Sequence, residues 1–275
     1  MEVLKSASEQ TASEYGMSEI KLEVSHIRKQ FDGEEVLKDI SFQVKKGEFL
    51  AILGLSGCGK TTLLRILIGL EHPDSGSIKK DGREISKLAP NERGMGIIFQ
   101  NYALFPNMTV LDNVAYALKL KKETKASAKE IALHTLEQIG MSEHLNKKPR
   151  QLSGGQQQRV AIARTLAMNP DIVLLDEPIS ALDVTNREIM KQELKAIQKK
   201  FHSTMIFITH EQEEAFYLAD RIMVMSEGRM EQLDTPENIF KNPANAFVRD
   251  FVVAHLEQKY ESLLKCTGRM KNEFN

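Results

Sequence analysis

Three glycines, a lysine and two hydroxyl side chains fall within eight positions in GLSGCGKT, residues 54–61. Glycine lets a backbone curl until successive N–H groups point inward, and such a concave surface binds phosphate oxygens. The apolar run EFLAIL before it predicts a buried strand, and the window 59–70 predicts a helix whose positive end faces the same ligand. A glycine-rich turn that matches by chance is the alternative. The order of strand, glycine loop and helix is nevertheless the context that a P-loop requires.

The side chains of this loop have separate predicted roles. Lys60 would supply a point charge to the β- and γ-phosphates of a nucleotide, and the Thr61 hydroxyl would bind Mg²⁺. Because the helix end and Lys60 lie beside it, the Cys58 thiol is expected to be more acidic than a free one. Its alkylation is expected to inactivate the protein, and bound ATP to prevent the reaction. The residues predicted to contact the nucleotide here are Gly54, Leu55, Ser56, Gly57, Cys58, Gly59, Lys60, Thr61 and Thr62.

Two adjacent carboxylates follow another apolar run, in IVLLDEP at residues 172–178. Because successive side chains of a strand point to opposite sides, Asp176 and Glu177 cannot share one task. We expect Asp176 to hold Mg²⁺ through its water shell and Glu177 to orient or deprotonate an attacking water. His210 directly follows the apolar run TMIFIT at the same predicted sheet edge, and is expected to contact the γ-phosphate. Taken singly, Asp176 and Glu177 could be a solvated strand end, and His210 could be a structural histidine. The presence of a P-loop favours a catalytic site that contains all three.

A second candidate anion site lies in RQLSGGQQQRVAIAR, residues 150–164. Ser153, Gly154 and Gly155 head a predicted helix over 153–168, so their N–H groups and the Ser153 hydroxyl can receive a second set of phosphate oxygens. The chain therefore has two predicted phosphate cradles, and the second one requires an explanation.

Taken in order, GLSGCGKT, LSGGQ, IVLLDEP and ITH resemble the nucleotide-binding subunit of ABC transporters over roughly residues 20–245. The pentapeptide LSGGQ beside a P-loop is highly specific to that family. In ABC ATPases two copies pack head to tail, and each ATP lies between the P-loop of one chain and the LSGGQ of the other. The resemblance thus accounts for both cradles, and it adds Gln156, the last residue of the pentapeptide, to the nucleotide contacts.

The resemblance assigns roles to three more residues. Gln100 in IIFQN is similar to the Q-loop glutamine of the family, which touches Mg²⁺ and communicates with the membrane subunit. Asp183 in SALD corresponds to the D-loop, and Phe31 to the aromatic residue that stacks on adenine, with edge-strand packing as the alternative for Phe31. The implied reaction is in-line attack of water on the γ-phosphate after ATP has drawn two chains together. The implied catalytic residues are Glu177, His210, Lys60 and Gln100, and the implied metal ligands are Thr61, Gln100 and Asp176.

The elements between these motifs alternate between strands and helices, which predicts a doubly wound α/β layer. IKLEVSHIRKQF and EVLKDISFQV, separated by DGE, predict a hairpin at its edge. The predicted buried strands are 48–53, 172–176, 204–209 and 221–226, and the helices of the core 59–70, 185–200 and 211–219. The helical windows of the middle region are 109–120, 126–139 and 153–168. The predicted fold is therefore α/β, a P-loop NTPase (RecA-like) core with a mostly parallel sheet, an N-terminal antiparallel β subdomain and an inserted α-helical subdomain.

The chain is expected to divide into three parts. Residues 1–18 are polar and without period, which predicts a mobile tail. Residues 19–245 would form the ABC ATPase domain, with the helical subdomain at about 101–165, and 246–275 a C-terminal helical extension. Members of the family often continue into a β-rich regulatory domain, and residues 246–275 are expected to be too few to form one.

Composition restricts the class of protein. A formal net charge of −1 over 275 residues disfavours a general nucleic-acid binder, and we expect no nucleic-acid partner. The two cysteines are too few and too distant for a disulfide framework. No window reaches the run of about 20 apolar residues that crosses a bilayer, and no secretory signal precedes the first motif. The expected location is the cytoplasmic face of the cell membrane, where a partner would hold the chain peripherally.

Two sequence segments resemble those of importer ATPases for polyamines, ferric ion, sugars or phosphonates. They are ALFPNMTVLDNV, which follows Gln100, and EGRMEQLDTPENIFKNPANAFV at 227–248. The implied function is ATP hydrolysis that energises solute uptake. The implied partners are a second copy of the chain, integral membrane permease subunits and, indirectly, an extracytoplasmic solute-binding protein. An exporter-type ABC ATPase and a non-transport ABC ATPase are the alternatives, although residues 62–152 lack the sustained heptads of the coiled-coil DNA-repair members. The solute itself is not encoded in the motifs.

Overall fold

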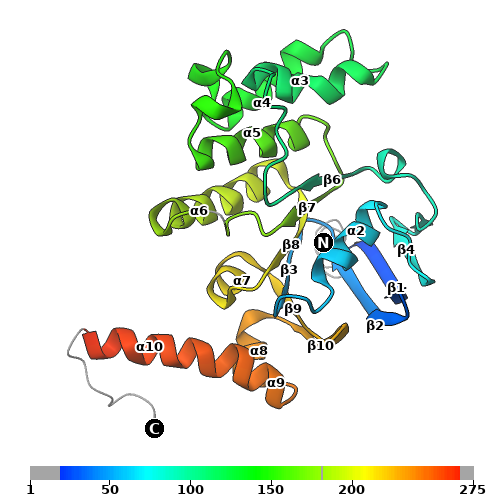
Figure 1. Cartoon of the computed structure of the whole chain (residues 1–275), viewed down its shortest axis with the longest axis vertical. Coiled ribbons are helices and arrows are strands. Elements are labelled where there is room, and N and C mark those ends of the chain that lie inside the picture. Colours follow the sequence, from blue (N-terminus) through cyan, green and yellow to red (C-terminus); the bar gives the residue numbers. More distant parts are fainter. Residues whose placement is uncertain (1–18, 181, 267–275) are drawn as a thin grey trace, which may run out of the picture.

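A computed structural model describes residues 19–180 and 182–266 of the chain (Figure 1). These residues form two β-sheets and a set of helices. The segment 1–18, predicted to be a mobile tail, lies outside these residues, as do residues 267–275 of the predicted C-terminal extension.

The smaller sheet is antiparallel throughout and has the strand order β2-β1-β4-β5. Its first hairpin joins β1 (Ile20–Phe31) to β2 (Glu34–Lys45), as predicted. Asp32 and Gly33 between them have φ angles of 49° and 86°, the left-handed pair that a tight hairpin turn requires. The sheet is completed by β4 (Ser75–Lys80) and β5 (Arg83–Glu84).

The larger sheet has the order β10-β9-β3-β8-β7-β6 and is parallel except for β10. The predicted buried strands are its central ones. Because the strands are parallel, β3, β7 and β8 end at one edge, where the candidate site residues follow them. The strand bounds are β3 (Phe49–Gly54), β6 (Met95–Ile98), β7 (Ile172–Asp176), β8 (Thr204–Thr209), β9 (Arg221–Ser226) and β10 (Arg229–Asp234).

Alternate residues of β3 belong to two separate hydrophobic clusters, one on each face of the large sheet. Phe49, Ala51 and Leu53 pack with the helical subdomain and the C-terminal helices. Leu50 and Ile52 pack with α2 (Lys60–Ile68) and with the inner face of the small sheet. The period of two along a strand thus explains why a continuous apolar run was needed at this position.

Three helices form a group at one end of the molecule, at the top of Figure 1: α3 (Val110–Leu120), α4 (Ala128–Gln138) and α5 (Gly154–Leu166). They agree with the helical windows predicted for residues 101–165. The predicted core helices are α2, α6 (Val184–Phe201) and α7 (Gln212–Leu218).

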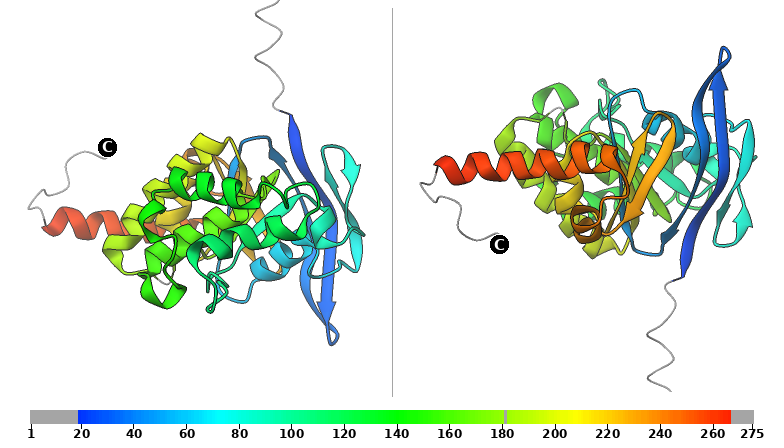
Figure 2. Two further views of the ribbon diagram at one scale, coloured as in Figure 1. Left: turned by 90° about the horizontal axis from the view of Figure 1, so that it is seen from above. Right: turned by 90° about the horizontal axis from the view of Figure 1, so that it is seen from below.

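The chain then continues through α8 (Pro236–Lys241), α9 (Ala246–Val248), the π-helix η4 (Arg249–Val253) and α10 (Ala254–Cys266). Both views of Figure 2 show α10 extending outward beyond the sheets. No helix within residues 19–180 and 182–266 has the length and apolar character needed to cross a bilayer.

Candidate functional site

The glycine loop connects the end of β3 at Gly54 to the start of α2 at Lys60. Gly57 and Gly59 have φ angles of 82° and 101°, in the left-handed region that side chains disfavour. A Cβ atom on Gly59 would lie 2.8 Å from Cδ2 of Leu37 in β2. Strand packing and backbone conformation therefore both require glycine here. The turn at residues 55–57 is exposed, so its backbone is open to a ligand.

Lys60 is buried, and its ammonium group is held by the loop itself. Nζ donates hydrogen bonds to the backbone oxygens of Gly54, at 2.8 Å, and Leu55, at 2.9 Å. A phosphate anion is a stronger acceptor for an ammonium group than a neutral carbonyl is. The lysine is thus placed where an incoming phosphate can replace these two contacts. Thr61 is exposed and Thr62 half-buried in the first turn of the same helix.

The prediction of an acidic Cys58 thiol is wrong. The side chain is only 7% exposed, and burial raises the pKa of the thiol despite the opposing effect of the Lys60 charge. Desolvation of a thiolate here outweighs the helix end and the lysine. The backbone oxygen of Cys58 accepts a hydrogen bond from the N–H of Gly228, so this residue fixes the loop to the β9–β10 turn.

The carboxyl ends of β7 and β8 bring the predicted acid and base residues together. Asp176 is the last residue of β7, and Glu177 follows it with a φ angle of 44°. Nδ1 of His210, the first residue after β8, lies 3.2 Å from Oε1 of Glu177. Both side chains are partly exposed, so a water molecule can reach them.

Asp176 has the electrostatic surroundings of a cation ligand. Burial and then the charge of Glu177 raise the pKa of its carboxyl group, against the opposing charges of Arg65 and Lys60. A divalent cation would offset both unfavourable effects. Within residues 19–180 and 182–266, no group of three or more His, Cys, Asp or Glu side chains could hold a metal ion on its own. A Mg²⁺ ion would therefore depend on phosphate oxygens and water as well as on Asp176 and Thr61.

Gln100 follows β6 and reaches the same carboxylate. Its Nε2 donates to Oγ of Ser180 at 3.1 Å and lies 3.5 Å from Oε2 of Glu177. The Ser180 hydroxyl in turn donates to the backbone oxygen of Glu177. Ser180 is thus a site residue that the sequence indicated only as the first letter of SALD.

The second predicted cradle is the start of α5. The Ser153 hydroxyl accepts a hydrogen bond from the N–H of Gln156 at 3.4 Å, and Oε1 of Gln156 accepts one from the N–H of Ser153 at 3.0 Å. This reciprocal capping box defines the helix start. Ser153 and Gly154 are exposed, and Gly155 and Gln156 are half-buried. In Figure 1, α5 belongs to the helical group whereas α2 packs against the sheets, so the two cradles lie on different parts of one chain.

Asp183 and Phe31 have structural contacts of their own. Asp183 caps α6, because Oδ1 accepts a hydrogen bond from the N–H of Asn186 at 3.0 Å. Phe31 ends β1 and is 42% exposed, with Nζ of Lys29 lying 5.0 Å from the centre of its ring. One ring is therefore available at the end of the strand, with a cation beside it.

Known proteins are similar to this chain over most of its length. The family model described as "ABC transporter" matches residues 37–180. The chain belongs to the ABC transporter family. The spermidine/putrescine import ATP-binding protein PotA of Marinobacter nauticus is 46% identical over 236 residues, which are 86% of this chain and 63% of that protein.

Two further relatives belong to the same family. The sulfate/thiosulfate import ATP-binding protein CysA 2 of Chromobacterium violaceum is 48% identical over 86% of this chain and 64% of its own length. The solved structure of cbiO1 from Clostridium perfringens, part of the ABC transporter complex cbiONQ, superposes with a TM-score of 0.76 and 29% identity, over 88% of this chain and 99% of that chain. This chain therefore spans a little under two thirds of the curated ABC relatives named here, and nearly all of the structural one.

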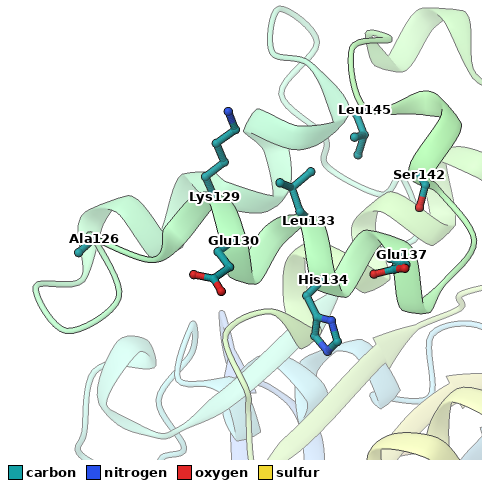
Figure 3. Close-up of a pocket in the computed structure, with 8 residues that line it drawn as sticks. All are labelled: Ala126, Lys129, Glu130, Leu133, His134, Glu137, Ser142 and Leu145. Atoms are coloured by element: carbon teal, nitrogen blue, oxygen red, sulfur yellow. The ribbon is translucent and has the colours of Figure 1, made fainter.

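A hollow of about 630 Å³ lies elsewhere, on α4 of the ABC chain (Figure 3). Its lining residues are Ala126, Lys129, Glu130, Leu133, His134, Glu137, Ser142 and Leu145. No predicted site residue is among them. The candidate site is instead the exposed edge of the large sheet, which joins the glycine loop to Glu177, His210 and Gln100.

Proposed function

We propose that this chain is the ATP-hydrolysing subunit of an ABC importer. The observation that carries the proposal is the joint placement of Gln100 and His210 on the two oxygens of Glu177, at the sheet edge where the glycine loop also ends. Phosphate binding alone would need only the loop. A carboxylate flanked by two hydrogen-bonding side chains is what an attacking water requires.

ATP would bind with its phosphates on the loop N–H groups and Lys60. Phe31 would supply the ring that stacks on adenine. Thr61, Asp176 and Gln100 would hold a Mg²⁺ ion, which would supply positive charge beside the phosphates. In this arrangement Glu177 orients or deprotonates the water, and His210 holds the water, the carboxylate and the γ-phosphate in register.

The second cradle supports a head-to-tail dimer. The start of α5 is exposed and lies apart from α2, so a second chain related by a two-fold axis is the simplest way to bring Ser153, Gly154 and Gly155 to a phosphate. Gln156 and Asp183 would lie along the same seam. ATP would draw the two chains together, and its hydrolysis would release them.

The importer assignment rests on relatives. PotA and CysA 2 are named as import ATP-binding proteins, and cbiO1 as part of a transporter complex. By the same logic, this chain would bind integral membrane permease subunits, lie peripherally on the cytoplasmic face of the membrane, and depend indirectly on an extracytoplasmic solute-binding protein. An ATPase domain at 19–245 and a C-terminal extension at 246–275 remain the predicted division of the chain.

A variant that disables the proposed base tests both halves of this proposal. Glu177→Gln keeps the shape of the side chain but removes the charge, so it should bind ATP, lose turnover by at least ~100-fold and accumulate as a dimer. Light scattering of the Mg-ATP-bound variant measures the dimer, and phosphate release measures turnover. Lys60→Ala is the matched control, which should bind ATP weakly and remain monomeric. Normal turnover by Glu177→Gln would show that Glu177 is not the base. A variant that is saturated with ATP but remains monomeric would contradict the proposed dimer.

A further inference from the structure

The backbone just after Gln100 is held in an unusual conformation. Tyr102 and Ala103 have φ angles of 59° and 45°, so two successive residues with side chains occupy the left-handed region. Neither residue is glycine, and each such conformation costs strain that surrounding contacts must offset. The contacts that hold this turn therefore also determine where Gln100 lies.

Arg164, on α5, holds the turn. Its Nη1 donates to the backbone oxygen of Ala103 at 2.7 Å, and its Nη2 donates to that of Tyr102 at 3.0 Å. The planar guanidinium fork therefore spans both strained peptides at once. The same group lies 5.8 Å from the ring centre of Phe105, which contacts Tyr116 of α3 at a ring distance of 4.7 Å.

The guanidinium of Arg164 is half-buried and donates its hydrogen bonds to backbone carbonyls. Within residues 19–180 and 182–266 no carboxylate pairs with its guanidinium, and burial lowers the pKa of the group. A half-buried cation without an anion is unfavourable unless its N–H groups are well used. Here they are used on two carbonyls of the strained turn, which a lysine cannot span in the same way.

We propose that Arg164 is a positioning residue, which fixes the turn at Tyr102 and Ala103 to α5 and so presents the Gln100 amide to Glu177 and Ser180. Gly154 begins the same helix, so a displacement of the second cradle is transmitted through Arg164 to the amide that contacts the base. This inference rests on the proposed ATPase function and specifies how one chain connects its two nucleotide-contacting parts. A purely local role in stabilising the turn is the alternative.

A double-mutant cycle on turnover separates the two roles. We expect Arg164→Lys to lower kcat ~10- to 100-fold with little change in KM for ATP, because the amide is misplaced while nucleotide contacts remain. If Arg164 acts through Gln100, then adding Arg164→Lys to Gln100→Ala should lower kcat no further. Arg249→Lys, an exposed arginine paired with its neighbour Asp250, is the matched control. Multiplied losses in the double variant, or unchanged kcat in Arg164→Lys, would overturn the proposal.

A spectroscopic measurement keeps the test independent of turnover. The chain contains no tryptophan, so Phe105→Trp introduces a single fluorophore beneath Arg164. Acrylamide quenching should increase when Arg164→Lys is added and stay constant when Arg249→Lys is added. Equal quenching in all three would overturn the positioning role even in a sample without ATPase activity. Absence of activity in the wild-type chain, with the quenching difference intact, would instead count against the proposed function alone.

Discussion

Oε1 of Glu177 lies 3.2 Å from Nδ1 of His210, although the two residues are 33 positions apart in the chain. The contact follows from register, because Asp176 is paired with Ile208 on the neighbouring parallel strand. The residues that continue from these two strands are then adjacent at the sheet edge. A left-handed turn at Glu177 directs its carboxylate to His210 on one side and to Gln100 on the other.

His210→Ala should lower kcat by ~100-fold or more and leave the Kd for ATP nearly unchanged, because the histidine positions the water and the base but adds little to binding of the ground state. Single-turnover hydrolysis and equilibrium binding of a fluorescent ATP analogue measure the two quantities. His134→Ala, an exposed histidine on α4 in Figure 3, is the control and should behave as wild type. A matching loss of ATP affinity in His210→Ala would contradict the assignment.

The buried Cys58 thiol is expected to be less reactive than a free thiol. Because burial raises the pKa of this thiol, iodoacetamide should modify it more slowly at pH 8 than it modifies free cysteine. The sign of the pH effect on stability is also determined. A folded-state pKa above the unfolded value stabilises the fold at pH values below about 9.0 and loses that contribution as the pH rises through the folded-state pKa.

Both effects can be measured on the same residue. Mass spectrometry gives the rate of modification at Cys58, and urea unfolding between pH 7 and 10 gives the free energy. Cys58→Ser serves as the control, and its pH dependence should be flatter. Rapid alkylation of the folded chain, at the rate of a solvent-exposed thiol, would show that the helix end dominates after all.

Gly59 in the glycine loop combines a strained backbone with close packing, whereas Gly82 has the strained backbone alone. Gly59→Ala should destabilise the chain more than Gly82→Ala, because both glycines have positive φ but only the Cβ at position 59 meets Leu37. Strain alone costs roughly 1–2 kcal/mol. Overpacking against β2 should add roughly 1–3 kcal/mol for Gly59. Urea denaturation of both variants gives the difference in the free energy of unfolding. Equal decreases would mean that β2 can move away from the added Cβ without loss of stability.

The sequence predicted the parts of this molecule that are set by local pattern. The buried runs that became β3, β7, β8 and β9 carry apolar side chains on both faces, and the turn Asp32–Gly33 has the residues that a tight hairpin needs. Glu177 and His210 could be placed together because parallel strands end at one edge. These predictions needed only periodicity and sheet geometry.

The remaining strands depend on neighbours that are distant in sequence. β6 has four residues and β10 has the polar sequence RMEQLD, so neither shows a strand pattern of its own. Pairing with β7 and β9 determines their conformation. The left-handed turn at Tyr102 is likewise held from outside, by Arg164. The pKa of the Cys58 thiol was predicted in the wrong direction, because the burial that raises it comes from packing outside the motif.

Arg93 is a buried residue that the sequence motifs did not indicate. It is fully buried, and its guanidinium donates to the backbone oxygens of Ile66 and Leu67 at the end of α2, at 2.7 and 2.9 Å, and to those of Ser86 and Leu88. A cation is favourable at a helix C-terminus, where carbonyls lack partners. The helix that it caps is the one that begins with Lys60.

Replacing Arg93 by methionine keeps most of the volume but removes the guanidinium donor from the backbone oxygens of Leu67, Ser86 and Leu88. The backbone oxygen of Ile66 keeps the N–H of Gly69 as a donor. Each unsatisfied group costs roughly 1–3 kcal/mol, so Arg93→Met should lower the free energy of unfolding by at least about 3 kcal/mol. The matched control is Arg83→Met on the exposed strand β5, which should change it by less than about 0.5 kcal/mol. Thermal unfolding of both variants measures the difference. If Arg93→Met melts with the control, the end of α2 does not depend on this guanidinium, and the helix carrying Lys60 is secured by its apolar face alone.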